Sequence, residues 1–245
     1  MSLLLTIVTV SSFDHLRLKL TLDSTRLLPA GVEHIFIIPE DDLISRNLLE
    51  KASIQGIQPK FYFDNNSGVY SAMNLGVTVA SGKFVIFWNS GDLLFSLSEL
   101  EKFLSELDSS KPTWAVAQGV LGSGSIYKNS LLEISNFGNQ KVGSYISHQT
   151  IACERRTMFD LGLFDAKYKI AADTKMIQKL IKHSTPMIST SRIVYIEEPR
   201  FSSKFHRRSR YETTKLAVLD LILCGNYKPF KNVCKRELLY LKQSF

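Results

Sequence analysis

The stretch from Asp64 to Asp92 reads DNNSGVYSAMNLGVTVASGKFVIFWNSGD. A polar turn at residues 64–68 is followed by small and apolar residues with helical spacing, and Ser81-Gly82 ends this helix. Residues 83–88 form an apolar run that is too short for a helix and is bounded by turn formers, which predicts a buried strand. The strand ends on Asn89-Ser90-Gly91-Asp92. Ligands bind beyond the carboxyl ends of strands in open α/β sheets, and an acid on such a turn can hold a divalent cation beside a phosphate.

Strands and helices alternate on both sides of this stretch. Upstream, the pattern predicts strands at residues 3–10, 33–38 and 59–63, with a helix to about residue 28 and another at 45–55. This order implies parallel strands joined by right-handed crossovers. The first helix is expected to present Leu16, Leu20, Leu22 and Leu27 as its apolar positions.

Downstream, the pattern predicts further helices and strands. Helices are expected at 97–107, at 155–161 and through 176–181, and strands at 114–118, 146–153 and 187–195. Residues 119–125, which contain three glycines, are expected to form a flexible turn.

Length and composition indicate one α/β domain of ordinary size, or one domain with an appendage. The chain has 245 residues, of which 44% are hydrophobic, so it can bury a core and is not disordered by composition. It lacks a signal-peptide pattern and an apolar run of about 18 residues. Three cysteines without C-x-x-C spacing argue against a metal cluster and fit a reducing compartment. These features predict a cytoplasmic protein.

The positive charge is concentrated at the end of the chain. Residues 200–245 contain eleven Lys or Arg and three Asp or Glu, whereas the preceding residues carry nineteen basic and twenty acidic side chains. Such asymmetry suggests an anionic partner for this segment, although a solvated helical face explains it too. Residues 211–224 and 233–242 predict two helices with apolar faces. These faces could pack on the main domain, on a second copy of the chain, or on a membrane surface.

Two segments of the opening stretch carry a resemblance to a known family. GVYSAMNLG at residues 68–76 and ASGKFVIFWNSGD at residues 80–92 follow the pattern G-[IV]-Y-D-A-M-N-x-G, then A-x-G-x-[FY]-[IVL]-x-F-L-N-[SA]-[DG]-D. In this they resemble the nucleotide-sugar glycosyltransferases of glycosyltransferase family 2. The resemblance covers residues 3 to 200. It implies a GT-A fold, a mostly parallel sheet flanked by helices, for residues 1–200, with residues 201–245 as a basic helical extension.

The resemblance assigns the chemistry to two acids. Asp92 stands at the last Asp of the metal-binding motif and would hold Mn²⁺ or Mg²⁺ against the leaving diphosphate, although Asp also forms turns. Asp173, in the run KIAAD at residues 169–173, would be the base that removes the proton of the acceptor hydroxyl in an inverting transfer. It also stands where a helix N-cap would, and both interpretations can hold together.

Other positions are expected to contact the two substrates. His148 and Gln149 are placed on the acceptor side, although a lone His is as often a hydrogen-bonded packing residue. The residues expected to bind the nucleotide sugar, most simply a UDP-sugar, are Ser11, Ser12, Phe13, Tyr70, Met73, Asn74, Asn89, Ser90 and Gly91. The family setting implies a saccharide or lipid-linked acceptor, synthesis of bacterial surface polysaccharide, and attachment of the basic extension to the inner membrane face.

The sequence departs from the family pattern at three positions. Ile38, Asn66 and Ser71 stand where Asp is usual, which leaves the identity of the nucleotide open. These departures also allow a degenerate transferase fold that binds sugar nucleotides without turnover. The basic tail with its aromatic residues allows a second hypothesis, a nucleic-acid-binding protein. No helix-turn-helix, zinc-finger or RNA-recognition pattern supports the second, so no nucleic-acid partner is expected. The first strand also lacks the G-x-G-x-x-G turn of a dinucleotide-binding dehydrogenase.

Overall fold

The computed structural model describes residues 3–54, 59–65, 67–123, 126–131, 146–197, 211–216 and 218. The described residues form one central sheet with the strand order β3-β2-β1-β4-β8-β6-β9-β5. A further strand, β7, pairs with β6 and is not part of this order. The first four strands are β1 (Leu5–Val10), β2 (Val32–Pro39), β3 (Lys60–Asp64) and β4 (Phe84–Asn89). They are all parallel, as the alternation of strands and helices predicts.

The second half of the sheet is mixed. Its strands are β5 (Leu93–Leu94), β6 (Trp114–Ser123), β7 (Ile126–Leu131), β8 (Ile151–Glu154) and β9 (Met187–Glu197). Strand β8 runs antiparallel to both β4 and β6, whereas β6 and β9 are parallel to each other. The predicted α/β sheet is therefore present, with antiparallel pairings in its later part.

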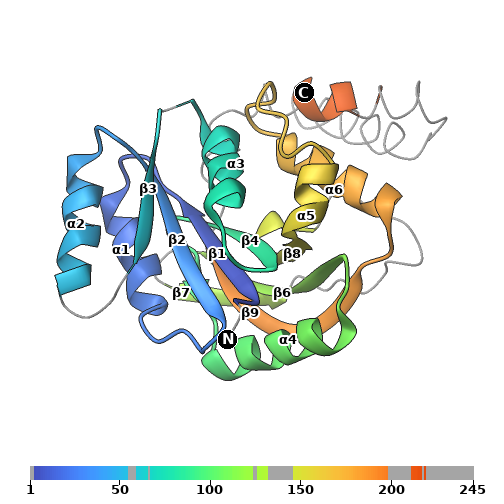
Figure 1. The fold of residues 1–245 in the computed structure, drawn as a ribbon, viewed down its shortest axis with the longest axis horizontal. Helices are drawn as coiled ribbons and strands as arrows, with labels where there is room; N and C mark the ends of the chain where they lie inside the picture. The colour runs from blue at the N-terminus through green and yellow to red at the C-terminus, as the bar shows by residue number, and fades with distance from the viewer. Residues whose placement is uncertain are drawn as a thin grey trace, which may run out of the picture.

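Helices cover both faces of the sheet (Figure 1). Helices α3 (Val69–Val79), α5 (Arg155–Asp160) and α6 (Ala172–His183) contribute buried side chains to the apolar cluster on one face. Helices α1 (His15–Ser24), α2 (Leu43–Ile54) and α4 (Leu97–Ser110) pack on the other face. Within the described residues, none of these helices combines the length and the hydropathy needed to cross a membrane.

The strand order defines where a ligand would bind. Strands β2 and β3 are added on one side of β1, and the chain then crosses to place β4 on its other side, with Val10 paired to Asn89. The carboxyl ends of β1 and β4 therefore flank the topological switch point, which is where open α/β sheets bind ligands. The turn Asn89–Asp92 follows β4 at this point.

Three local predictions were wrong. Helix α1 ends at Ser24, and Leu16, Leu20 and Leu27 are exposed while Leu18, Thr21 and Leu22 face inward. Strand β6 continues through the glycines of residues 119–122 instead of turning there. The predicted strand at 146–153 begins with a 3₁₀ turn, η1 (His148–Thr150), and only then becomes β8.

Candidate functional site

Asp92 is held by backbone amides at the end of β4. Its Oδ2 accepts a hydrogen bond from the amide of Asn89 at 2.7 Å, and its Oδ1 accepts one from the amide of Glu197 at 3.1 Å. The carboxylate thus closes its own turn and fastens the end of β9 to it. Asp92 is only 1% exposed, and burial raises its pKa to about 6, although the two amide bonds act in the opposite direction.

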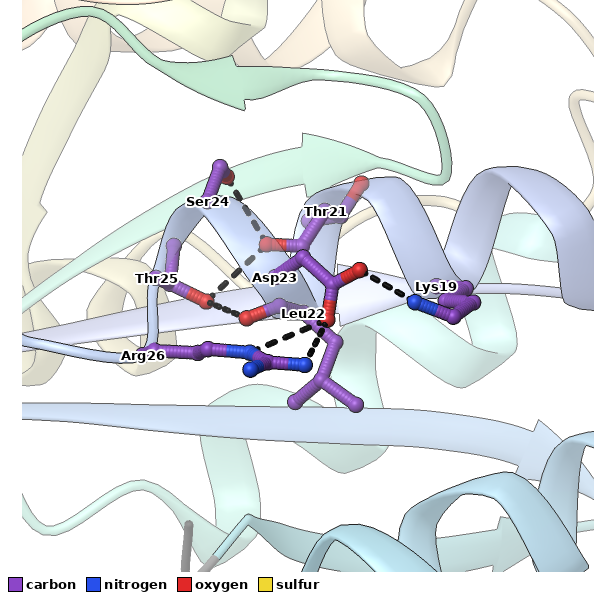
Figure 2. A network of polar contacts seen from close by, with 7 residues as sticks. All are labelled: Lys19, Thr21, Leu22, Asp23, Ser24, Thr25 and Arg26. Carbon is purple, nitrogen blue, oxygen red and sulfur yellow. Dashed lines mark hydrogen bonds and ion pairs between the residues drawn. The ribbon is translucent and has the colours of Figure 1, made fainter.

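The end of α1 supports the same turn. The amide of Gly91 donates to Thr21 Oγ1 at 2.9 Å, and the amide of Leu94 donates to Ser24 Oγ at 3.1 Å. Figure 2 shows how this last helical turn is itself fixed: the hydroxyls of Ser24 and Thr25 donate to the Thr21 carbonyl at 2.8 and 3.0 Å. A helix end with tied hydroxyls gives the turn after β4 a rigid support.

In the same view, Asp23 pairs with Lys19 and with Arg26 on the outer side of α1. These exposed ion pairs join residues three and four positions apart, so they stabilise the helix by only a few tenths of a kcal/mol. They face away from the turn and are not candidates for chemistry.

A charged pair lies directly over Gly91. Arg17 donates to Glu197 Oε1 at 2.8 Å and to Asp14 Oδ2 at 3.3 Å. Gly91 has φ +99°, and a Cβ at this position would lie 2.3 Å from Glu197 Oε2. Only glycine leaves room for the Glu197 carboxylate here, so the turn and the end of β9 are built to fit each other. Neither Arg17 nor Glu197 carries a sequence pattern that would have identified it.

The loop after β1 lies beside the turn. Ser90 Oγ donates to the carbonyl of Val10 at 3.3 Å. The amide of Phe13 donates to Asp42 Oδ2 at 2.8 Å, and the other oxygen of Asp42 accepts the amide of Ser45 at the start of α2. Phe13 has φ 54° and is 55% exposed, so an aromatic ring is presented to solvent at the carboxyl edge of the sheet.

The 3₁₀ turn η1 joins the two predicted acids. His148 Nδ1 lies 3.3 Å from Asp173 Oδ2, and His148 and the next residue, Gln149, both act to lower the pKa of the Asp92 carboxyl against the effect of its burial. The carbonyl of Gln149 in turn accepts the indole N–H of Trp88 at 3.2 Å, which anchors η1 to β4. His148 Nε2 is buried and has no hydrogen-bond partner among the described residues. A buried imidazole nitrogen without a partner is costly unless a ligand or water supplies one.

Asp173 lies in the first turn of α6, where Ala171 is the N-cap residue. Its Oδ1 accepts the amide of Thr174 at 2.7 Å and the hydroxyl of Tyr70 at 3.1 Å. Burial raises the pKa of Asp173, but the bonds from His148, Thr174 and Tyr70 outweigh it, so the pKa lies below its usual value. The carboxylate is therefore ionised at neutral pH.

Tyr70 contacts Asp173 and not the turn after β4. Its hydroxyl also donates to the carbonyl of Ile170, and burial together with the charge of Asp173 raises its pKa far above the usual range. It is therefore a fixed donor at any pH at which the protein is folded. The resemblance of the sequence to the family predicts instead that Tyr70 binds the nucleotide sugar.

Two other predicted contacts are used within the protein. Met73 is 1% exposed within the apolar cluster under α3. Asn74 forms a two-way clamp, with Nδ2 donating to the Phe164 carbonyl and Oδ1 accepting the Phe164 amide, both at 2.9 Å. The structure thus assembles Ser11, Ser12, Phe13 and residues 89–92 at one edge and gives Met73 and Asn74 packing contacts. Asn66 lies outside the described residues.

The carboxylate oxygens of Asp92 could bind a divalent cation if the turn that buries them moved slightly. Each carboxylate oxygen accepts a single amide and has further lone-pair capacity, and Mg²⁺ or Mn²⁺ commonly takes one or two carboxylates while phosphates and waters supply the remaining ligands. Because Asp92 is almost fully buried, coordination requires a small movement of the turn or of Glu197. In the described part of the chain, no group of three or more His, Cys, Asp or Glu is arranged around a metal position.

No protein-family model matches the sequence, and no characterised protein sequence matches it significantly. Solved structures do resemble it. Residues 1–349 of S. aureus TarS superpose with a TM-score of 0.65 at 16% identity, over 86% of this chain and 65% of that one. The complex of the same TarS fragment with UDP-GlcNAc gives 0.64 at 16% identity, over 86% and 66%. The mannosyltransferase PcManGT from Pyrobaculum calidifontis, in complex with GDP-Man and Mn²⁺, gives 0.63 at 14% identity, over 94% and 68%.

These likenesses confirm the predicted fold class. The chain has a GT-A-like α/β fold, with a central sheet covered by helices on both faces. It spans about two thirds of the length of the TarS fragment and 40% of the longer TarS structure.

Proposed function

We propose that this chain is a glycosyltransferase that moves a sugar from a nucleotide diphosphate sugar to a hydroxyl acceptor. The observation that carries the proposal is the connection made by η1. Asp92 and Asp173 are 81 positions apart in the sequence, yet His148 pairs with Asp173 and, together with its neighbour Gln149, also lowers the pKa of Asp92. This arrangement lies at the carboxyl end of β4, in a fold shared with proteins solved with UDP-GlcNAc and GDP-Man.

The reaction needs a base on the acceptor side. In an inverting transfer the acceptor oxygen attacks the anomeric carbon while the bond from that carbon to the diphosphate oxygen breaks, and the hydroxyl proton passes to a nearby base. Asp173 is ionised, and Tyr70 and Thr174 hold one of its oxygens, so it suits this role. His148 Nε2 is a second candidate for the same proton, with Asp173 then orienting the imidazole through Nδ1.

The donor is proposed to bind between the loop after β1 and the turn after β4. The exposed ring of Phe13 offers a stacking surface for a nucleobase, and the half-buried residues Asn89 to Gly91 lie next to it along β1 and β4. Asp92 would hold the divalent cation, which neutralises charge on the leaving diphosphate when bound. Arg17, above Gly91, adds a fixed positive charge at the same edge.

The finer assignments rest on the sequence resemblance. They are the inverting outcome, UDP as the preferred nucleotide, and the choice of Mn²⁺ or Mg²⁺. They also include a saccharide or lipid-linked acceptor in surface-polysaccharide synthesis. The cytoplasmic location, the attachment to the inner membrane face and the homodimer are proposed from composition and from the charge and apolar faces of the extension. GDP-Man in the mannosyltransferase complex makes a GDP-sugar the natural alternative donor to test.

The experiment is a turnover assay with a panel of nucleotide sugars. Wild-type protein with Mn²⁺ should release nucleoside diphosphate from one or a few donors, faster when an acceptor is present. The Asp173→Asn variant should bind the same donor and release the diphosphate far more slowly. Binding without release by the wild-type chain, across the donors and acceptors tested, would favour the degenerate-transferase hypothesis.

A further inference from the structure

A short part of the basic extension lies against the loop that leads into α6. Residues 211–216 are helical, and the two members of this turn that face inward are Glu212, 5% exposed, and Leu216, 4% exposed. Leu216 joins the apolar cluster formed by α3, α5 and α6. In Figure 1 this segment, in orange-red, lies next to the loop that precedes α6. An acid four residues from a buried leucine is unusual on an inward face, because an ionised carboxylate is buried only when it is well paired.

The partners of Glu212 are three consecutive backbone amides. Oε2 accepts the amides of Lys169, Ile170 and Ala171 at 3.1, 2.9 and 3.1 Å, and Oε1 accepts Lys169 again at 3.0 Å. These amides precede helix α6, whose N-terminal end carries a partial positive charge. The carboxylate therefore pairs with the N-cap amide of Ala171 and with the two loop amides before it, from a segment about forty residues further along the chain.

The same loop carries the base. The carbonyl of Ile170 accepts the hydroxyl of Tyr70, the Tyr70 hydroxyl also reaches Asp173, and Asp173 is two residues beyond Ala171. Fixing the peptide planes of residues 169–171 fixes the Ile170 carbonyl, and with it the direction from which Tyr70 and the α6 backbone approach Asp173. Lys215 adds a second contact to this loop, with its Nζ 5.5 Å from the centre of the Tyr168 ring.

We infer that residues 211–216 belong to the candidate active site, with Glu212 as a positioning residue for Asp173. The extension beyond the GT-A-like domain is then not only a charged appendage: its carboxylate holds the loop that presents the base. The catalytic part of this inference rests on the proposed function, whereas the contact itself does not.

The test compares Glu212→Gln with the wild-type full-length chain. The variant side chain has the same size but is neutral, and its amide group has one accepting oxygen in place of two, so the three amides lose their bonds to a charged acceptor. Hydrogen exchange of the amides of residues 169–171 should then accelerate by about 10- to 100-fold, the range expected for losing bonds to a charged acceptor. The kcat should fall by a similar factor with the donor KM unchanged, because the donor edge is not touched. Glu101→Gln, an exposed acid on α4, is the matched control and should change neither quantity.

The outcomes separate the inference from the proposed function. Unchanged exchange at residues 169–171 in Glu212→Gln would overturn the contact. Faster exchange with an unchanged kcat would overturn the positioning role and leave Glu212 as a packing residue. A wild-type chain without turnover would contradict the proposed function instead, and the exchange measurement would still decide the contact. Leu216→Ala, which weakens docking of the segment while keeping the carboxylate, should change exchange and kcat in the same direction.

Discussion

At the scale of single residues, backbone amides and not packing set the positions of both acids. Asp92 accepts the amides of Asn89 and Glu197, and Asp173 accepts that of Thr174 and a hydroxyl. Amide bonds to a carboxylate fix direction as well as distance, which suits groups that must meet a ligand in one orientation. The environments of the two acids push their pKa values apart: burial raises that of Asp92 to about 6, and hydrogen bonds lower that of Asp173.

The first prediction concerns the base. Asp173→Asn should lower kcat by about 10²–10⁴-fold with little change in donor affinity, because general-base catalysis contributes about that much. Asp160→Asn, an exposed acid on α5, serves as the matched control. The measurement is steady-state turnover together with donor titration. A loss of thermal stability without a loss of kcat would show that Asp173 only caps α6.

The second prediction separates Asp173 from His148. If the imidazole takes the proton through Nε2, His148→Gln should cost as much as Asp173→Asn, and the double variant should be no worse than either single one. Residues that act as one unit are non-additive in this way. If Asp173 acts directly, the His148 variant should retain more activity. Strictly additive losses in kcat would contradict a shared role for the pair.

The third prediction concerns pH and Asp92. Its folded pKa of about 6 lies above the ordinary Asp value of 3.8, so the folded state binds this proton more tightly than the unfolded state does. The stability it contributes is complete below pH 3.8 and is lost as pH rises through about 6, and about two pKa units correspond to about 3 kcal/mol. The free energy of unfolding of Asp92→Asn minus that of wild type should therefore increase between pH 4 and pH 7. Denaturant titrations at several pH values measure this difference, and a difference independent of pH would contradict the buried carboxyl.

At the scale of helices and strands, the sequence predicts where elements lie better than which side they bury. The parallel strands β1 to β4 lie within about two residues of their predicted bounds, because most are apolar runs between turn formers, whereas helix α1 ends four residues before the predicted end. The predicted apolar face of helix α1 is right for Leu22 but wrong for Leu16 and Leu20, which are exposed, while Thr21 points inward and its hydroxyl binds the Gly91 amide. A threonine at such a position looks polar in a pattern, and only its partner explains its burial.

The glycines of β6 gave a different error. Gly119 was expected in a turn, but it lies within the strand, where a Cβ would come 2.7 Å from Ile196 Cδ1 and 3.0 Å from Thr150 Cγ2. Glycine is required at this position because β9 and η1 pass close to the backbone. The sequence alone cannot predict this close approach. The contacts that complete the candidate site were unpredictable for the same cause. His148 with Asp173, Arg17 with Glu197, and Glu212 with the 169–171 loop all join residues distant in sequence.

The fourth prediction concerns Glu33, whose carboxylate joins several strands where they begin. The Glu33 carboxylate on β2 accepts Thr6 Oγ1 at 2.6 Å and Lys60 Nζ at 2.7 Å, and it also accepts the Ser81 and Gly82 amides. It thereby ties β1, β2, β3 and the start of β4 together. Glu33→Gln should lower the free energy of unfolding by about 1.5–3 kcal/mol, as for lost bonds to a charged group.

Its control is Glu50→Gln, which removes an exposed pair with Arg46 on α2 and should cost no more than about 0.5 kcal/mol. Urea titrations of both variants provide the comparison. Equal small effects in the two variants would show that the Glu33 network contributes little to holding the strands.

At the scale of the whole molecule, two roles are proposed for the basic extension: packing within the protein and attachment to a membrane. Glu212 and Leu216 are used within the protein, which favours packing for this part of the apolar face. The basic cluster Lys204, Arg207, Arg208 and Arg210 lies outside the described residues and precedes this docked segment in the sequence. Docking by residues 211–216 would fix where such a cluster is presented.

The fifth prediction is that this cluster attaches the protein to anionic membranes. Each Lys or Arg near such a surface contributes roughly 1 kcal/mol. The protein should sediment with anionic liposomes at low salt, less at high salt, and less again when the four residues are changed to Ser. Neutral liposomes are the control. Equal recovery in the supernatant with anionic and neutral vesicles at low salt would contradict a membrane role.

The account as a whole depends on Asp92 and the turn after β4 forming a nucleotide-diphosphate site. The most direct measurement is the thermal shift of wild type and Asp92→Asn with UDP, GDP and their sugar conjugates, each with and without Mn²⁺. Ligands that bind the folded state raise its stability with the logarithm of their concentration over Kd. The account predicts that one nucleotide diphosphate raises the melting temperature of the wild type, more with Mn²⁺ than without, and that Asp92→Asn loses the Mn²⁺ increment. No shift of the wild type with any of these ligands, or the same Mn²⁺ increment in the variant, would contradict it.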